Sequence, residues 1–104
     1  MKKLVALACL AVAAAPALAA WPEKPIRIVV GFAPGSGTDW TGRTIGEEIA
    51  SALNTTVIVE NKAGAEGRIG TEFVAKAPPD GYTLMIASSA THSAIAGLVK
   101  TLPY

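Results

Sequence analysis

The most constraining feature of this sequence is the alternation of β-branched strands with amphipathic helices. Strands are predicted over residues 26–31, 57–60 and 82–87, and helices over residues 40–53 and 68–77. Strands joined through helices of this length are typically parallel, with right-handed crossovers. We therefore expect an α/β fold with a βαβαβ core.

The composition of the strands predicts their order in the sheet. The first strand is apolar on both faces except at Arg27, which is typical of a central strand covered on both sides. The second strand is short and ends in the charge of Glu60, so we expect it at the outside. The order 2-1-3 satisfies both conditions and puts the helices on opposite faces. Its switch point lies between strands one and three, where open α/β sheets bind ligands.

The helices carry their own packing predictions. In the first helix, Arg43 is spaced to pair with Glu47 on the polar side. In the second helix, Ile69, Phe73 and Val74 are predicted to face the core. Both helices are thus expected to lie on the sheet through apolar side chains.

A glycine-rich turn after the first strand gives the strongest functional signal. Its residues are Phe32, Ala33, Pro34, Gly35, Ser36, Gly37, Thr38 and Asp39. Small residues let the backbone approach a ligand closely, and a helix start presents unpaired N–H groups carrying roughly half a positive charge. Such a corner suits a carboxylate or a phosphate. It matches neither nucleotide-binding glycine motif, and it would equally serve as a plain tight turn capped by Ser36 or Thr38.

Two kinds of side chain in this turn are open to more than one interpretation. Asp39 stabilises a helix start by about 0.3–1 kcal/mol, but its charge would repel an anionic ligand. It either folds back to brace the loop, which we favour, or accepts an ammonium group of a ligand. The aromatic residues Phe32 and Trp40 could pack on a ligand, but core packing is favoured.

A second polar turn follows the third strand. Ser88, Ser89, Thr91 and His92 supply hydroxyl groups and one imidazole. In the order 2-1-3 this turn and the turn at residues 32–39 converge at one end of the sheet, and we predict that they bind a carboxylate together. The alternative is a polar loop with a capping serine.

Catalytic and metal sites are disfavoured. A hydrolase triad of Ser, His92 and Asp39 lacks the Gly-x-Ser-x-Gly elbow. One histidine and scattered acids make a poor metal site. We therefore expect a protein without enzymatic activity, without catalytic residues and without a metal or cofactor.

The N-terminus is predicted to be a secretory signal peptide over residues 1–19. A basic start precedes the apolar run Leu4–Ala15, and Ala17–Ala19 fits a small-x-small cleavage site. The segment around Cys9 loosely resembles a lipoprotein motif, but the apolar run continues beyond the cysteine. We expect cleavage, which leaves residues 20–104.

The composition of the exported part excludes several classes of partner. Without the leader, the chain has seven basic and eight acidic residues, a net charge of −1, and no basic run. Nucleic-acid binding is therefore not expected. The exported part also has no cysteine, which is compatible with a bacterial periplasmic domain rather than a disulfide-stapled one.

Taken in order, these residues resemble one family, the extracytoplasmic solute receptors of tripartite tricarboxylate transporters, also called Bug-type receptors. The resemblance covers residues 20–104. Its main stretches are residues 21–30, the turn at 32–39, residues 59–65, residues 74–77, residues 79–84, the turn at 89–92 and residues 102–104.

The resemblance implies one lobe of a periplasmic-binding-protein fold, in which two α/β lobes close on a small carboxylated solute. It implies that the loops at Phe32–Asp39 and Ser88–His92 hold a carboxylate through backbone N–H groups, hydroxyls and bridging water, and that membrane permease subunits are the partners. This sequence departs from the family pattern at Ser36, which stands where a further glycine is usual, and at Ala63, which replaces a proline.

Length is the larger departure, because members of the family are several times longer. The resemblance therefore implies an incomplete first lobe, from a fragment or a truncated gene. A remnant that binds nothing, or that needs a separate second half, is the alternative; a small hydrolase is a distant third.

Overall fold

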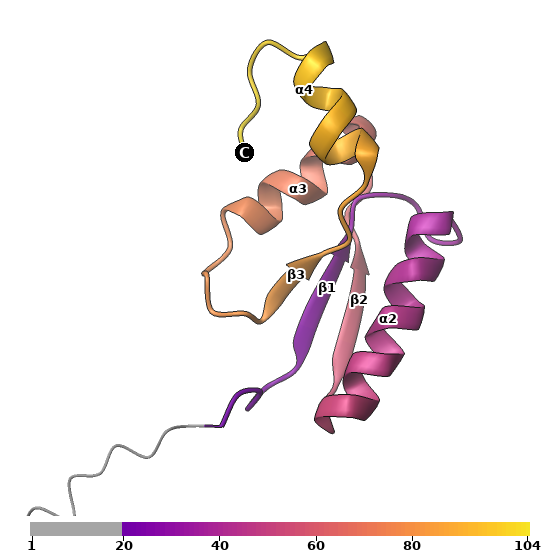
Figure 1. Cartoon of the computed structure of the whole chain (residues 1–104), viewed down its shortest axis with the longest axis vertical. Coiled ribbons are helices and arrows are strands. Elements are labelled where there is room, and N and C mark those ends of the chain that lie inside the picture. The colour runs from indigo at the N-terminus through magenta and orange to yellow at the C-terminus, as the bar shows by residue number, and fades with distance from the viewer. Residues whose placement is uncertain (1–19) are drawn as a thin grey trace, which may run out of the picture.

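The strand β1 (Ile26–Val30) forms the centre of the fold in the computed structural model, which describes residues 20–104 (Figure 1). It pairs in parallel with β2 (Val57–Asn61) on one side and with β3 (Thr83–Met85) on the other. The sheet order β2-β1-β3 confirms the predicted order and the α/β class. The expected signal peptide lies outside the described residues.

Burial explains why β1 is central. Ile26, Ile28, Val29 and Val30 are each no more than 1 % exposed, so both faces of the strand are covered. Arg27, the one polar residue of β1, reaches Glu60 on β2 with its Nε 3.2 Å from the carboxylate. A strand that is apolar on both faces except at Arg27 thus lies in the centre of the sheet, where both of its faces are covered.

Two helices cover the two faces of the sheet, and glycines make the contact. The helix α2 (Gly37–Leu53) lies on one face and α3 (Arg68–Ala75) on the other (Figure 1). A Cβ added at Gly42 of α2 would lie 2.8 Å from Val30 Cγ2, and one at Gly70 of α3 would lie 3.5 Å from Val29 Cγ1. Val29 and Val30 point to opposite faces because side chains alternate along a strand, so the helices lie on opposite faces as predicted.

Capping residues fix the ends of α2. The Ser36 hydroxyl accepts a hydrogen bond from the Asp39 N–H at 3.2 Å, so the helix begins at Gly37, three residues earlier than the sequence suggested. At the other end Asn54 takes a left-handed conformation, with φ 48°, and its N–H bonds the carbonyl oxygens of the last turn. Of the two residues that the sequence offered as the N-terminal cap, Ser36 and Thr38, the structure therefore uses Ser36.

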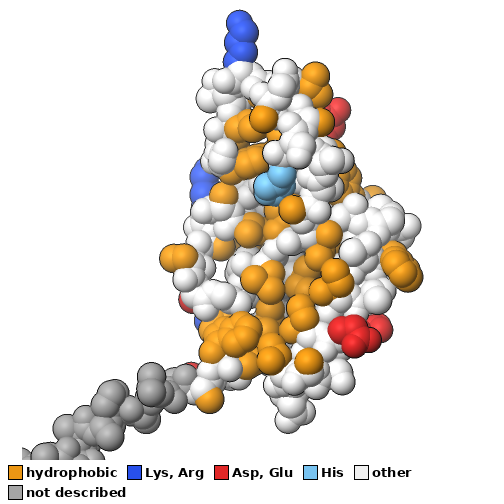
Figure 2. Space-filling model, in the orientation of Figure 1, with side chains coloured by type: hydrophobic (Ala, Val, Ile, Leu, Met, Phe, Trp, Pro, Cys, Tyr) orange, Lys and Arg blue, Asp and Glu red, His pale blue; other side chains and the backbone are white. Residues whose placement is uncertain are grey.

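Some predicted core residues are exposed. Ile69 is 52 % exposed, contrary to its predicted place in the core, because α3 lies on the sheet through Gly70 and Thr71 instead. Trp40, also predicted to pack in the core, is 70 % exposed. On the face of the molecule that Figure 2 shows, a band of hydrophobic side chains lies between the positions of β3 and α2 in Figure 1.

The chain continues after β3 through the π-helical turn η2 (Ala90–Ala94) into α4 (Ile95–Leu98). Ile95 is 2 % exposed and fixes this segment to the core. Among residues 20–104 no helix combines the length and apolar character needed to cross a membrane.

Replacing Gly42 with alanine is expected to lower the free energy of unfolding by about 1 kcal/mol. Alanine favours a helix by about 0.5–1 kcal/mol over glycine, but overpacking costs about 1–3 kcal/mol. The new Cβ would lie 2.8 Å from the buried Val30 side chain. The measurement is the urea midpoint of the whole chain.

The matched control is Gly37→Ala in the same helix, where an added Cβ would meet nothing within 4 Å. This variant is expected to be neutral or slightly stabilising. A midpoint for Gly42→Ala at or above that of the parent chain would contradict the close approach of α2 to β1.

Candidate functional site

The three connections that leave the carboxyl ends of the strands lie at one end of the sheet, because all three strands are parallel (Figure 1). They comprise the loop at 32–39 after β1, the segment at 62–67 after β2, which includes the 3₁₀ turn η1 (Ala65–Gly67), and the turn at 88–92 after β3. The two loops singled out in the sequence thus start from neighbouring strands.

Gly67 is the point at which the three connections meet. A Cβ added there would lie 2.5 Å from Thr91 Cγ2 and 3.2 Å from Phe32 Cζ. Its φ of +86° also favours glycine. The first and third loops therefore both contact the second connection at this position. The local sequence around Gly67 does not indicate this role, because its contacts come from residues distant in the sequence.

Asp39 braces the first loop from inside. It is only 4 % exposed, and its Oδ2 accepts hydrogen bonds from the Gly35 N–H at 2.9 Å and from Arg43 Nε at 3.0 Å. The Asn61 side-chain amide donates to Asp39 Oδ1 at 2.9 Å and to the Phe32 carbonyl oxygen at 3.0 Å. Of the two interpretations of Asp39, these contacts support the brace.

The same contacts change the electrostatics of the loop. The Arg43 guanidinium, the Gly35 amide and the Asn61 amide lower the pKa of Asp39 from 3.8 to about 2. The carboxylate is therefore ionised at neutral pH, with its charge taken up by partners. Arg43 bonds Asp39 one turn before it, rather than the predicted Glu47 one turn after it.

Two backbone N–H groups of the first loop have no hydrogen-bond acceptor within residues 20–104. The amides of Gly37 and Thr38, in the first turn of α2, have no acceptor among residues 20–104, whereas Asp39 N–H is bonded to Ser36. Unpaired amides at a helix start carry the positive end of the helix dipole. Gly35 and Gly37 are exposed and Thr38 is half-buried, so an anion has access to this corner.

The third loop is organised around Thr91, which is fully buried. Its hydroxyl accepts a hydrogen bond from the Ser88 N–H at 3.1 Å and lies 2.7 Å from His92 Nδ1. The Tyr104 hydroxyl donates to the Thr91 carbonyl oxygen at 3.0 Å. Ser89 and His92 are exposed, so the loop offers their polar groups to solvent while Thr91 holds the turn together.

These contacts bear on the chemistry that the loops can perform. The imidazole of His92 is bonded to Thr91, and the carboxylate of Asp39 is bonded to Gly35, Arg43 and Asn61, so the two do not form an Asp–His pair. Within residues 20–104 no group of three or more His, Cys, Asp or Glu side chains could hold a metal ion. The arrangement suits holding an anion through amides and hydroxyls.

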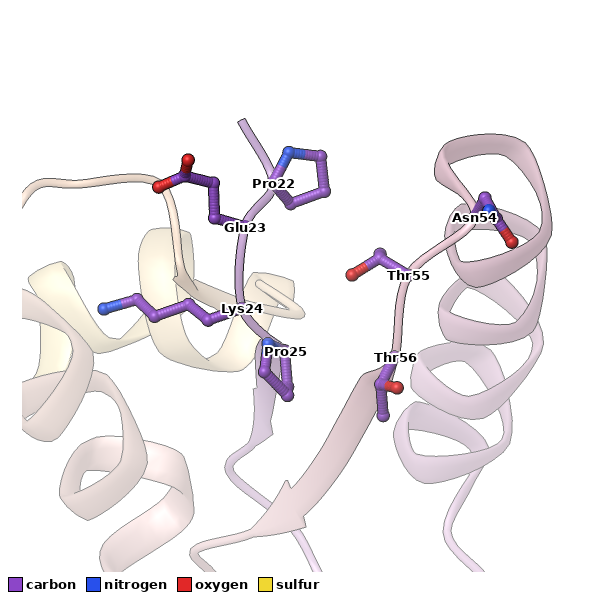
Figure 3. Close-up of a pocket in the computed structure, with 7 residues that line it drawn as sticks. All are labelled: Pro22, Glu23, Lys24, Pro25, Asn54, Thr55 and Thr56. Atoms are coloured by element: carbon purple, nitrogen blue, oxygen red, sulfur yellow. The ribbon is translucent and has the colours of Figure 1, made fainter. Parts of the chain in front are cut away.

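A hollow of about 450 Å³ lies at the opposite end of the sheet (Figure 3). It is bounded by residues 22–25 before β1 and by residues 54–56 before β2. Thr55 and Thr56 lie on one side of the hollow. The side chains of Glu23 and Lys24, on the other side, point away from them, so charged groups do not converge in the hollow (Figure 3). This hollow is therefore a surface depression remote from the loops at 32–39 and 88–92.

Comparison with known proteins identifies the family. The family model described as tripartite tricarboxylate transporter family receptor matches residues 41–104. The chain belongs to this family. Among its relatives, protein BugT of Bordetella pertussis is 40 % identical over 85 residues, which make up 81 % of this chain and 26 % of BugT.

Solved structures of similar proteins share the fold. The periplasmic binding protein BugD matches 62 % of this chain and 22 % of its own, with 49 % sequence identity and a TM-score of 0.60. MatC of Rhodopseudomonas palustris, whose structure contains bound malate, matches 62 % of this chain and 22 % of its own, with 40 % identity and a TM-score of 0.60. The chain spans about a quarter of the length of the curated relatives it matches.

Replacing Gly67 with alanine is expected to lower the free energy of unfolding by more than about 1 kcal/mol, because the native φ disfavours any side chain and the added Cβ would overlap the Thr91 methyl group. The amide resonances of the turns containing Phe32 and Thr91 should shift as well. Urea unfolding and ¹⁵N NMR spectra measure the two effects.

Gly35→Ala is the matched control, since Gly35 has a similar φ of +85° but open space around it. It should share the conformational cost without displacing the Thr91 turn. Equal changes in the Thr91 resonances for both variants would argue against the contact at Gly67.

Proposed function

We propose that this chain is part of a solute-binding receptor that captures a small carboxylate between the loops at 32–39 and 88–92. The observation that carries the proposal is that the Gly37 and Thr38 amides, at the start of the 17-residue helix α2, have no acceptor within residues 20–104. They would donate to one ligand carboxylate. Ser88, Ser89 and His92 on the neighbouring loop would bond its other oxygen directly or through water, with Thr91 shaping that loop.

Family membership supports the choice of a carboxylate. The related MatC structure contains malate, a dicarboxylate. An acid group is the part that di- and tricarboxylates have in common, and a pair of amides recognises it without specifying the rest of the molecule. The proposal therefore names the chemical class and leaves the rest of the solute open.

The location and partners belong to the same proposal. Residues 1–19 would direct export to the periplasm, and residues 20–104 would form the first part of one lobe of a two-lobe receptor. The receptor would deliver its solute to the membrane permease subunits of a tripartite tricarboxylate-type uptake system. It would have no catalytic activity, metal or cofactor.

The alternative is a chain that binds nothing alone or needs a separate second half. Exposed apolar side chains, including Leu84 on β3 and Leu98 on α4, favour it, because such surface is normally covered. A whole receptor with a micromolar dissociation constant has a binding free energy of about −8 kcal/mol. If one lobe supplies half of it, about −4 kcal/mol remains, which corresponds to a millimolar dissociation constant.

Titration of the ¹⁵N-labelled chain with malate tests the function. We expect shifts that saturate at millimolar concentration, on the order of 1 mM for the dissociation constant, because one lobe supplies about half of the contacts. The shifts should be concentrated at Gly37, Thr38 and residues 88–92.

Malamide is the matched control ligand, because it has malate's shape without its charge, and it should leave these resonances unchanged. Shifts at residues 22–25 and 54–56 instead would move the site to the hollow at the other end of the sheet. Saturation by malate at micromolar concentration would contradict the expected half-site affinity.

A further inference from the structure

The Asp39 carboxylate and the Asn61 amide hold the first loop at three separate points. Asn61 bonds the loop's first residue through the Phe32 carbonyl oxygen at 3.0 Å and its last residue through Asp39 Oδ1 at 2.9 Å. Asp39 bonds the middle of the loop through the Gly35 N–H at 2.9 Å. The beginning, middle and end of the loop are thus tied to the end of β2.

We propose that Asp39 and Asn61 are positioning residues. They fix the loop so that the Gly37 and Thr38 amides face a bound carboxylate, but Asp39 and Asn61 do not contact the carboxylate. This inference rests on the proposed function. The inference adds to the proposed function that part of the affinity of the site comes from side chains on the inner side of the loop.

The loop needs such a brace because its own conformation is loosely specified. Gly35 has a φ of +85° with open space around its α-carbon, so no side-chain packing holds it. A loop of this kind loses conformational freedom when a ligand orders it, and that loss weakens binding. Bonds that hold the loop in advance reduce the loss and strengthen binding.

Arg43 allows an acidic brace beside an anion site. Its Nε bonds Asp39 Oδ2 at 3.0 Å, and its second guanidinium nitrogen bonds Asn61 Oδ1 at 3.2 Å. The charged group that contacts Asp39 from its own helix is Arg43, and the contacts from β2 and the loop come from the neutral Asn61 amide and the Gly35 N–H. The carboxylate can therefore orient the amides without facing a ligand as a free charge.

Acid titration gives the brace a spectroscopic signature. The pKa of Asp39 is lowered to about 2 in the folded chain. A lowered pKa stabilises the folded state above the ordinary value of 3.8, and this stabilisation is lost as the pH falls through about 2. The Gly35 amide resonance should therefore titrate with a midpoint near pH 2, and that titration should vanish in Asp39→Asn.

The test compares Asp39→Asn and Asn61→Ala with the parent chain, using malate as the probe. Each variant removes a bond to the loop, and we expect about tenfold weaker malate binding or more, which is the lower end of the range for losing a hydrogen bond to a charged group. The double variant should bind about as weakly as the worse single variant, because both act through one network.

Glu47→Gln is the matched control. Glu47 lies on the same helix, is exposed, and joins none of the ion pairs formed within residues 20–104, so its loss of charge should leave malate binding unchanged. If Asp39→Asn does not fold, Asn61→Ala carries the test alone, because it leaves the Asp39–Gly35 bond and the Asp39–Arg43 ion pair in place.

Two results would overturn the inference. One is unchanged malate affinity in Asp39→Asn and Asn61→Ala despite a lower urea midpoint, which would make these residues structural only. The other is a Gly35 resonance that titrates alike in the parent chain and in Asp39→Asn. If the parent chain shows no response to malate, the proposed function fails, and the brace is then judged by the Gly35 titration alone.

Discussion

The burial of β1 is the constraint on which the rest of the structure depends. Four apolar side chains of this strand are buried, and each contributes about 1.5–3 kcal/mol when fully removed from water. Strands on both sides and helices on both faces are needed to cover them. Parallel pairing then brings all three strand ends to one edge, so the core that stabilises the fold also brings the loops together.

At that edge, an acidic residue faces inward beside the proposed anion site. Asp39 lies in the first turn of α2, where its negative charge interacts favourably with the positive end of the helix dipole and stabilises the helix. Its oxygens are occupied by Gly35, Arg43 and Asn61, so the exposed side of the loop presents amides instead. One residue thus stabilises the helix start and shapes the loop, which explains how the two roles are compatible.

The sequence predicted the strand order because the strands differ in hydrophobic pattern: the first is apolar except at Arg27, and the second is short and carries the charge of Glu60 near its end. The predicted Glu47 partner of Arg43 was wrong, because Asp39 stands at equal spacing on the other side of Arg43. Asn61 from β2 bonds both Arg43 and Asp39 and so favours that pair. Likewise Gly67 gains its role only when Phe32 and Thr91 meet there. Contacts between segments distant in sequence are what local patterns lack.

The charge balance of the proposed site has a consequence for selectivity. The Asp39 and Arg43 charges cancel in a 3.0 Å pair, which leaves about half a positive charge from the α2 dipole and two free amides. Such a corner attracts any carboxylate and distinguishes poorly among them, because it contacts only the group they share. In the proposed receptor, residues that recognise the remainder of the solute would therefore lie away from this corner, and the first loop would stay the same for different solutes.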